Sequence, residues 1–145
     1  MKEAVGGTFM IYVLLIFIAV YITFVAVALN YAKAFRVKNS VIDIIEQNEG
    51  MTDDELNDIN KSGDTITKIN ERLKDYNYYI TLSDSYLDKY NDYTCFDRGY
   101  CISKVGDIRE YYRVVTFVQL SIPFIDFNIT IPIRGETRVI ERINS

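Results

Sequence analysis

The chain begins with a long segment that carries no charged side chain, from Ala4 to Ala32. The centre of this segment, from Phe9 to Leu29, is apolar apart from Tyr12, Tyr21 and Thr23. As a helix rising about 1.5 Å per residue, this centre spans about 31 Å, close to the bilayer's hydrocarbon thickness of about 30 Å. The sequence therefore predicts a transmembrane helix over residues 9–29, preceded by a short leader or tail over residues 1–8.

A cleaved secretory signal peptide and the buried core helix of a soluble protein are the two alternative interpretations of this segment. The apolar region of a signal peptide is shorter, about 7–15 residues, and ends at small residues followed by a break in the pattern. Small residues also occur here, at Ala26, Ala28, Ala32 and Ala34, but the helical pattern continues beyond them. The length of the run favours a retained anchor.

Residues 30–50 are predicted to extend the same helix into water, because no Gly or Pro occurs between Thr8 and Glu49. One side of this extension carries a stripe at helical spacing, formed by Val37, Val41, Ile44, Ile45 and Asn48. An apolar stripe on an aqueous helix requires a covering surface. Gly50 is predicted to end the helix, because glycine adopts the left-handed conformation without steric cost.

Residues 51–145 are predicted to form a head that begins with two short helices. The run from Thr52 to Glu55 has the pattern of a capping box, and Leu56 and Ile59 give the first helix an apolar edge. This helix is predicted to end near Gly63. Asp64 or Thr65 is predicted to cap the second helix, whose apolar face carries Ile66, Ile69, Leu73 and Tyr76.

The rest of the head changes to the period of two that is typical of strands. Tyr78–Leu82 is a short candidate, and Glu110–Ile122 is the clearest strand, with a predicted core face of Val114, Thr116, Val118, Leu120 and Ile122. Pro123 and Pro132 are predicted to bracket a connection to a returning strand, Ile133–Ile143. Ile133, Thr137 and Val139 are predicted on one side of that strand, opposite charged residues at Arg134, Glu136, Arg138 and Arg142. The predicted fold class is α+β, with a small antiparallel sheet.

Composition excludes several kinds of chemistry. The chain has no His, which removes His-based nucleophiles, His general bases and the usual zinc sites. A net charge of −4 argues against binding nucleic acid. Carboxylates recur at helical spacing at Asp84, Asp88 and Asp92, but no nucleophile, paired base or phosphate-binding Gly loop accompanies them. We therefore expect neither enzymatic activity nor a cofactor or metal.

Cys95 and Cys101 flank a Tyr- and Asp-rich stretch with Gly99 between them. Their spacing favours a small disulfide loop, with free thiols or a catalytic pair as the alternatives. A disulfide indicates an oxidising compartment and places the head outside the cytoplasm. The charges next to the apolar run indicate the opposite orientation, because Lys33, Arg36 and Lys38 follow it. We predict a cytoplasmic N-terminus and an extracytoplasmic head, giving the cysteines more weight.

Several features together resemble the TadE-like pseudopilins of Gram-positive Tad-type pilus systems. They are the leader with Gly6 and Gly7, the apolar helix, the extension AFRVKNSVIDIIEQNEG and the C-terminal pattern PFIDFNITIPIRGETRVI. The resemblance implies a membrane-anchored subunit that packs through its N-terminal helix into or onto a surface filament. The partners it implies are membrane lipid, other pilus or pseudopilin subunits, a secretion ATPase and a platform membrane protein.

The resemblance also implies a possible processing site at Gly6 and Gly7. Pilin-like proteins are often cut after a Gly and carry Glu at the fifth position of the mature chain. Cleavage after Gly7 would place Tyr12 at that position. This departure favours an uncleaved minor component.

Small and polar residues of the apolar helix are the candidates for helix packing, because apolar surface gives helices no drive to associate in lipid. They are Ala19, Tyr21, Thr23, Ala26, Ala28, Asn30 and Ala32. The alternative function is a membrane-tethered binding module that uses the Tyr-rich loop 86–100, because Tyr and Asn offer contact area and hydrogen bonds at low entropic cost.

Overall fold

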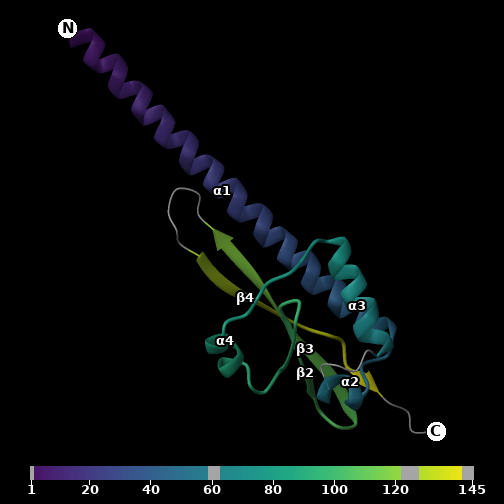
Figure 1. Ribbon diagram of the computed structural model, residues 1–145. Coiled ribbons are helices and arrows are strands. Elements are labelled where there is room, and N and C mark those ends of the chain that lie inside the picture. The colour runs from purple at the N-terminus through teal and green to yellow at the C-terminus, as the bar shows by residue number, and fades with distance from the viewer. Residues whose placement is uncertain (1, 59–62, 122–127, 142–145) are drawn as a thin grey trace.

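One helix runs through the whole molecule and carries the head at its C-terminal end (Figure 1). The fold is taken from a computed structural model that describes residues 2–58, 63–121 and 128–141. Helix α1 spans Lys2–Gln47, so residues 2–8 of the predicted leader continue the same helix as the predicted membrane span. The N-terminus lies at the free end of this rod, far from the head.

Helix α1 ends where the sequence predicts. Glu49 and Gly50 both have positive φ, 56° and 106°, and the Gly50 N–H donates to the Ile45 carbonyl at 2.9 Å. A Cβ on Gly50 would also lie 2.8 Å from the Tyr112 hydroxyl oxygen. Both the left-handed backbone and the close approach of Tyr112 therefore favour glycine at this position.

The two predicted short helices are present, with corrected ends. Helix α2 (Asp53–Asn57) starts with the capping box of Thr52 and Glu55, but it stops at Asn57, earlier than predicted, and Ile59 lies outside the described residues. Helix α3 (Asp64–Asp75) is capped by Gly63, and neither Asp64 nor Thr65 is the cap. The Thr65 hydroxyl instead contacts the end of α1, accepting from Asn48 and donating to the Gly50 carbonyl.

A third short helix, α4 (Asp84–Lys89), was not predicted. The predicted strand Tyr78–Leu82 is wrong, since these residues form no strand. The backbone of these residues contacts the hairpin formed by residues 94–105, because the Ile80 N–H donates to the Arg98 carbonyl. Strand-like periodicity arose here because Tyr78 and Ile80 are buried while Tyr79 and Thr81 are exposed.

The head contains one antiparallel sheet with the strand order β1-β2-β3-β4. These strands are β1 (Thr94–Phe96), β2 (Tyr100–Val105), β3 (Arg109–Ser121) and β4 (Asn128–Glu136), and a short fifth strand, β5 (Ile140–Glu141), pairs with the start of β3. The predicted α+β class and small antiparallel sheet are confirmed. The β1–β2 hairpin was predicted only as a disulfide loop, because β1 is too short to show a pattern.

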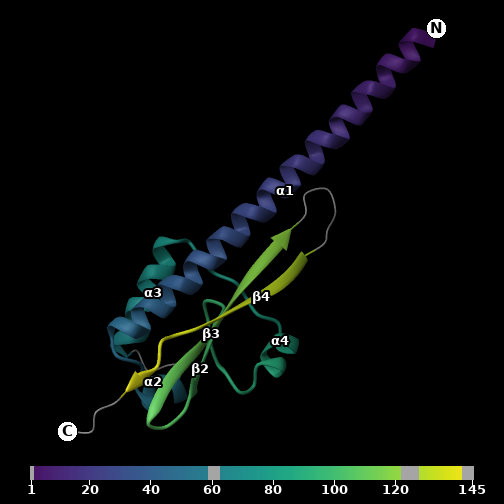
Figure 2. The ribbon, with the colours of Figure 1, turned by 180° about the vertical axis from the view of Figure 1, so that it is seen from behind.

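Strand β3 matches the predicted Glu110–Ile122 closely, but its burial does not alternate. The predicted core residues Val114, Thr116 and Val118 are buried, and so are Val115 and Phe117 on the opposite face. Leu120 is partly buried, and Ile122 lies outside the described residues. Both faces of β3 are covered: α1 packs on one face, and the segment that contains α4 covers the other (Figure 2).

The returning strand differs from its prediction in both position and faces. Strand β4 starts at Asn128, so Pro132 lies inside it, opposite Phe117, and does not bound a connection; Pro123 lies outside the described residues. Proline is tolerated there because β4 is an edge strand. Ile133 and Thr137 are buried as predicted, but Val139 is 56 % exposed because the strand breaks after Glu136.

The charged side of the returning strand does not form one ladder. Arg113 of β3 pairs across the sheet with Glu136 of β4 at 3.1 Å, as a cross-strand charge pair would. Arg138 instead pairs with Glu46 of α1, also at 3.1 Å. Arg142 and Ile143, the predicted end of the strand, lie outside the described residues.

The C-terminal third of α1 forms the centre of the head. The predicted stripe is confirmed, because Val37, Val41, Ile44 and Ile45 are buried. They lie in the part of α1 that packs with α3 on one side and with β3 and β4 on the other. The core of the head therefore includes the C-terminal third of α1, and the N-terminal part of the same helix projects from the head.

Candidate functional site

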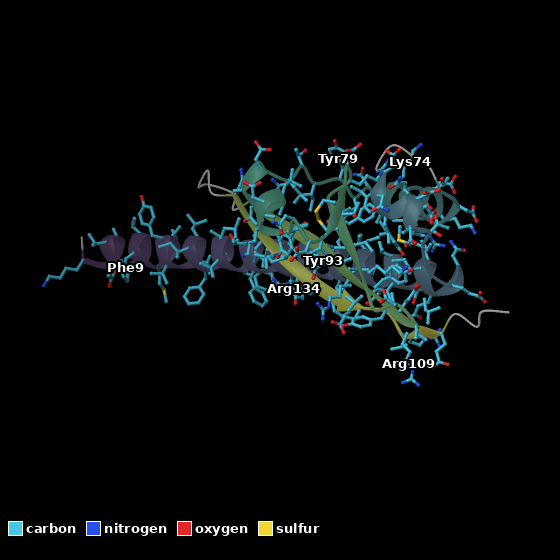
Figure 3. The ribbon with its side chains drawn as sticks, turned by 90° about the horizontal axis from the view of Figure 1, so that it is seen from below. Phe9, Lys74, Tyr79, Tyr93, Arg109 and Arg134 are labelled. Carbon is cyan, nitrogen blue, oxygen red and sulfur yellow. A yellow bond between two sulfur atoms is a disulfide. The ribbon has the colours of Figure 1, made fainter. Side chains whose placement is uncertain are left out.

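The N-terminal half of α1 is an apolar rod without a cover. The most apolar stretch of α1 is long and apolar enough to cross a membrane, and none of it is buried within the structure. Large side chains such as Phe9, Phe17 and Phe24 stand exposed along it, as Phe9 shows in Figure 3. A core helix of a soluble protein would be covered by its own chain. This half of α1 is therefore the first candidate functional surface.

Helical geometry divides the predicted packing residues between two opposite sides of α1. About 18 residues make five turns, so Ala19, Thr23 and Ala26 align with Val37, Val41 and Ile44, on the side that the head covers further along. Tyr21, Ala28 and Ala32 align instead with the exposed Asn39. The structure therefore does not bring the seven predicted packing residues together on one surface, because four of them, with Asn30, lie on the head side and three lie on the opposite side.

The two sides differ in what they offer a neighbour. On the head side, the Thr23 hydroxyl already donates to the Ala19 carbonyl within its own helix at 2.9 Å. Asn30 lies on this side too and lines a small pocket with Gln119 of β3, so the head approaches this side. On the other side, which we call the open face and define by Tyr21, Ala28 and Ala32, all three residues are exposed.

The junction between rod and head is fixed by polar contacts. The Lys33 ammonium donates to the Asn77 carbonyl at 2.9 Å, and the Thr116 hydroxyl donates to the Ala34 carbonyl at 3.3 Å. The Ser40 hydroxyl lies 3.1 Å from that of Tyr76, and this hydrogen bond lowers the pKa of Tyr76. Lys33 thus contacts the head at the point where the apolar surface ends.

The possible processing residues lie within the exposed start of α1. A Cβ on Gly6 or Gly7 would meet nothing within 4 Å, so packing does not require glycine at either position. Both residues are helical. Packing therefore does not explain why both positions carry glycine.

The predicted disulfide is present. Cys95 and Cys101 lie directly opposite each other in the β1–β2 pair and are bonded, which rejects the free-thiol alternative. Cys101 is fully buried on the face of the sheet that points away from α1, and it pairs with Val115 of β3. The bond therefore fixes β1, the edge strand of the sheet, which lies within the Tyr-rich loop 86–100.

The Tyr-rich loop 86–100 is only partly a surface. Tyr90 and Tyr100 are buried, and Tyr86 and Tyr93 are partly buried. The Tyr90 ring lies edge-on to Phe117 at 5.7 Å, and the Tyr100 ring stacks on Phe96 at 4.8 Å. Tyr90 thus covers the sheet at Phe117, whereas Tyr100 belongs to β2 and its hydroxyl donates to the side-chain oxygen of Asn70 in α3, so both rings are part of the core.

A groove that sequence reasoning missed lies beside this loop. It has a volume of about 730 Å³ and lies between the end of α2, residues 79–82, the end of α4 and β1. Tyr79 and Leu87 are exposed at it, and Tyr79 lies outside the loop predicted to make contacts. The sequence carries no distinct signal for it, because its walls come from four separate segments.

The described part of the chain shows no grouping of three or more acidic or Cys side chains that could hold a metal ion. Asp84, Asp88 and Asp92 are exposed. The candidate surfaces are therefore the rod and the groove. No model of a known family matches the chain, and comparisons with curated proteins and with solved structures also found no match.

Proposed function

We propose that this chain is a membrane-anchored, pilin-like structural subunit, a minor component or assembly factor of a Tad or type IV-like pilus that packs through its N-terminal helix. The observation that carries the proposal is the division of α1 between two surroundings. Its C-terminal third is the core of the head, while its N-terminal half is apolar and uncovered. Because one continuous helix joins the two parts, it would hold the head at a fixed position relative to the membrane.

The open face of α1 is the side that would contact neighbouring subunits. A neighbour that packed on the opposite side, along Ala19 and Ala26, would run toward the head, which covers Val37 and Val41 further along the same side. Along the open face, the small residues Ala28 and Ala32 allow close approach of a second helix. This side stays accessible as far as Asn39, so two parallel rods could remain in contact beyond the lipid.

The disulfide supports an extracytoplasmic head with the N-terminus in the cytoplasm, since disulfides persist in oxidising compartments. The head would then stand outside the cell membrane, within or beside a surface filament. The partners of this arrangement are lipid, other pilus or pseudopilin subunits, a secretion ATPase and a platform membrane protein. Gly6 and Gly7 would remain in the chain, as Tyr12 in place of Glu suggests.

Cysteine crosslinking in membranes tests the assembly surface. We expect Ala28→Cys to form a disulfide-linked dimer on oxidation, because the open face would bring two copies of this position together. The matched control is Ala26→Cys, which lies on the head side and should give at least about tenfold less dimer if the crosslinking rate follows the local concentration of the two thiols. Gel electrophoresis without reductant measures both.

Three outcomes would contradict the proposal. They are recovery of the chain in the soluble fraction without detergent, equal crosslinking of both variants, and a preference for Ala26→Cys. Mass spectrometry of the extracted chain tests the leader: a start at Met1 or Lys2 supports an uncleaved subunit, and a start at Thr8 contradicts it.

A further inference from the structure

The groove beside the Tyr-rich loop has the build of a binding site. We call it the tyrosine groove and define it by Tyr79, Leu82, Leu87, Asn91, Tyr93 and Asp97. Its volume of about 730 Å³ falls within the range of about 300–1,000 Å³ that is typical of ligand pockets. It lies on the head, away from the N-terminal half of α1, so it is separate from the surface proposed for assembly.

The floor of the tyrosine groove is held rigidly. The Tyr90 ring packs edge-on against both Phe117 and Tyr93, with centroids 5.7 and 5.6 Å apart. The disulfide of Cys95 fixes β1, which forms one wall, to the strand beside it. A preformed floor lowers the entropic cost of binding, because little of the site needs to become ordered.

The opposite wall leaves aromatic and apolar surface uncovered. Tyr79 is 64 % exposed and Leu87 is 40 % exposed, although their neighbours Tyr78, Ile80 and Tyr90 are buried. Figure 3 shows Tyr79 at the surface of the head. Among the described residues, no hydrogen bond or ring contact holds the Tyr79 side chain against the head. A large exposed ring beside a groove favours a ligand that stacks on it.

Charge and polarity narrow the ligand class. Among the described residues that line the groove there is no Lys or Arg, and Asp97 contributes a carboxylate, so the site disfavours phosphates and other anions. Asn91 and Asp97 offer amide and carboxylate groups for hydrogen bonds to hydroxyls. Strand β1 has three residues, which is a short edge for an extended peptide to pair with.

We propose that the tyrosine groove binds a neutral oligosaccharide, with one sugar ring stacked on Tyr79 and its hydroxyl groups bonded by Asn91 and Asp97. Sugar rings present one apolar face of C–H groups and a rim of hydroxyls. The groove is lined by the exposed ring of Tyr79 and by the polar side chains of Asn91 and Asp97, which complement these two features. The inference does not depend on pilus assembly, since it uses only the head.

Calorimetric titration of the full chain in phosphatidylcholine nanodiscs tests the proposal; glycoside detergents are avoided because they carry sugars. The probes are cellohexaose and chitohexaose, with hexagalacturonate as the anionic comparison and a neutral Thr-Val heptapeptide as the extended-peptide comparison. We expect at least one neutral oligosaccharide to bind with a Kd of about 0.1–1 mM. Tyr79→Ala should weaken that binding at least about tenfold, equivalent to about 1.4 kcal/mol.

Two further variants separate binding from folding. Tyr79→Phe keeps the ring and should bind within about threefold of the wild type, because stacking carries most of the contact. Tyr111→Ala removes a tyrosine that does not line the groove and should leave binding unchanged. The proposal is overturned if neither neutral probe binds at about 5 mM, a concentration that would detect even millimolar affinity. It is equally overturned if Tyr79→Ala binds like the wild type, or if the uronate or the peptide binds more tightly than both neutral probes.

Discussion

Tyr78 completes the sheet where strand pairing stops. The last residue pair between β2 and β3 joins Tyr100 to Thr116. Beyond it, the Tyr78 hydroxyl accepts the N–H of Phe117 at 3.0 Å and lies 2.7 Å from the carbonyl oxygen of Gly99. Burial raises the pKa of Tyr78 to about 12. A side chain thus satisfies backbone groups that a longer β2 would otherwise pair.

Replacing Tyr78 by Phe tests this role. The variant leaves the Phe117 N–H without its acceptor, so we expect the free energy of unfolding at pH 7 to fall by about 1–3 kcal/mol. Urea unfolding measures the change. Tyr79→Phe is the matched control, because that side chain is exposed, and it should be neutral. A Tyr78→Phe variant as stable as the wild type would refute the role.

The same variant changes the alkaline limit of stability. The folded-state pKa of Tyr78 lies above the ordinary value of 10.0. The stability that the buried, neutral hydroxyl of Tyr78 contributes is therefore fully present below about pH 10 and is lost as pH rises toward about 12. Over this interval the unfolding free energy of the wild type should fall more steeply than that of Tyr78→Phe. Parallel curves would contradict the assignment. Buried Tyr100, whose pKa is also raised, should titrate in both proteins.

At the scale of elements, the short edge strand β1 depends on a covalent bond. Strand β1 has three residues and pairs with β2 on one side. A strand of this length has few hydrogen bonds to hold it, and the bond between Cys95 and Cys101 joins the pair at its centre. The turn that follows uses Gly99 at a φ of 87°, where a Cβ would lie too close to the Ile80 carbonyl oxygen.

Removing the disulfide should destabilise the head. Closing a loop of about seven residues contributes about 2–2.5 kcal/mol in the chain-entropy model, so the Cys95→Ser, Cys101→Ser double variant should lose about that much. Denaturant unfolding of wild-type and variant chains measures the difference. Reduction of the wild type serves as the control and should give a similar loss. If the double variant and the reduced wild type each lost less than about 0.5 kcal/mol of unfolding free energy, the disulfide would make no significant contribution to stability.

Helix prediction was accurate where a period of about 3.6 residues was long, or where a capping box marked the start as at α2, and failed at α4, which has neither signal. The stripe of α1 and the apolar face of α3 follow that period over several turns. Helix α4 has six residues, too few for a pattern, and no side chain caps its start. The cap of α3 was also missed, because Gly63 offers no side chain and the hydroxyl of Thr65 is used elsewhere.

At the scale of the whole molecule, the apolar rod and the head cannot be separated at Gly50. Val37, Val41 and Ile45 are fully buried in the head core, although they belong to the rod. The boundary of the folding unit therefore lies within α1, near Ala34, where the helix becomes buried.

Two truncated chains test this boundary. A chain that starts at Lys33 should fold and stay in solution, because it keeps the core and lacks the apolar run. A chain that starts at Gly50 should not fold, since losing four buried side chains at about 1.5–3 kcal/mol each removes about 6–12 kcal/mol. That loss is comparable to a whole domain's stability of about 5–15 kcal/mol. Circular dichroism and thermal unfolding measure both, and a cooperative transition in the shorter chain would contradict the prediction.

The apolar run, the stop at Gly50 and the long strand β3 could be read from the residues alone, because each is set by local physics: transfer out of water, backbone sterics and side-chain alternation. Which surfaces of the elements become buried and which stay exposed could not be read from the residues alone. Val115 and Phe117 are buried because a distant tyrosine segment covers the second face of the sheet. Helical geometry places Ala26 and Ala28 on opposite sides of α1, but the fold decided that the head covers the side that carries Ala26, along Val37 and Val41. Such outcomes depend on which segments meet after folding, and no local pattern encodes that meeting.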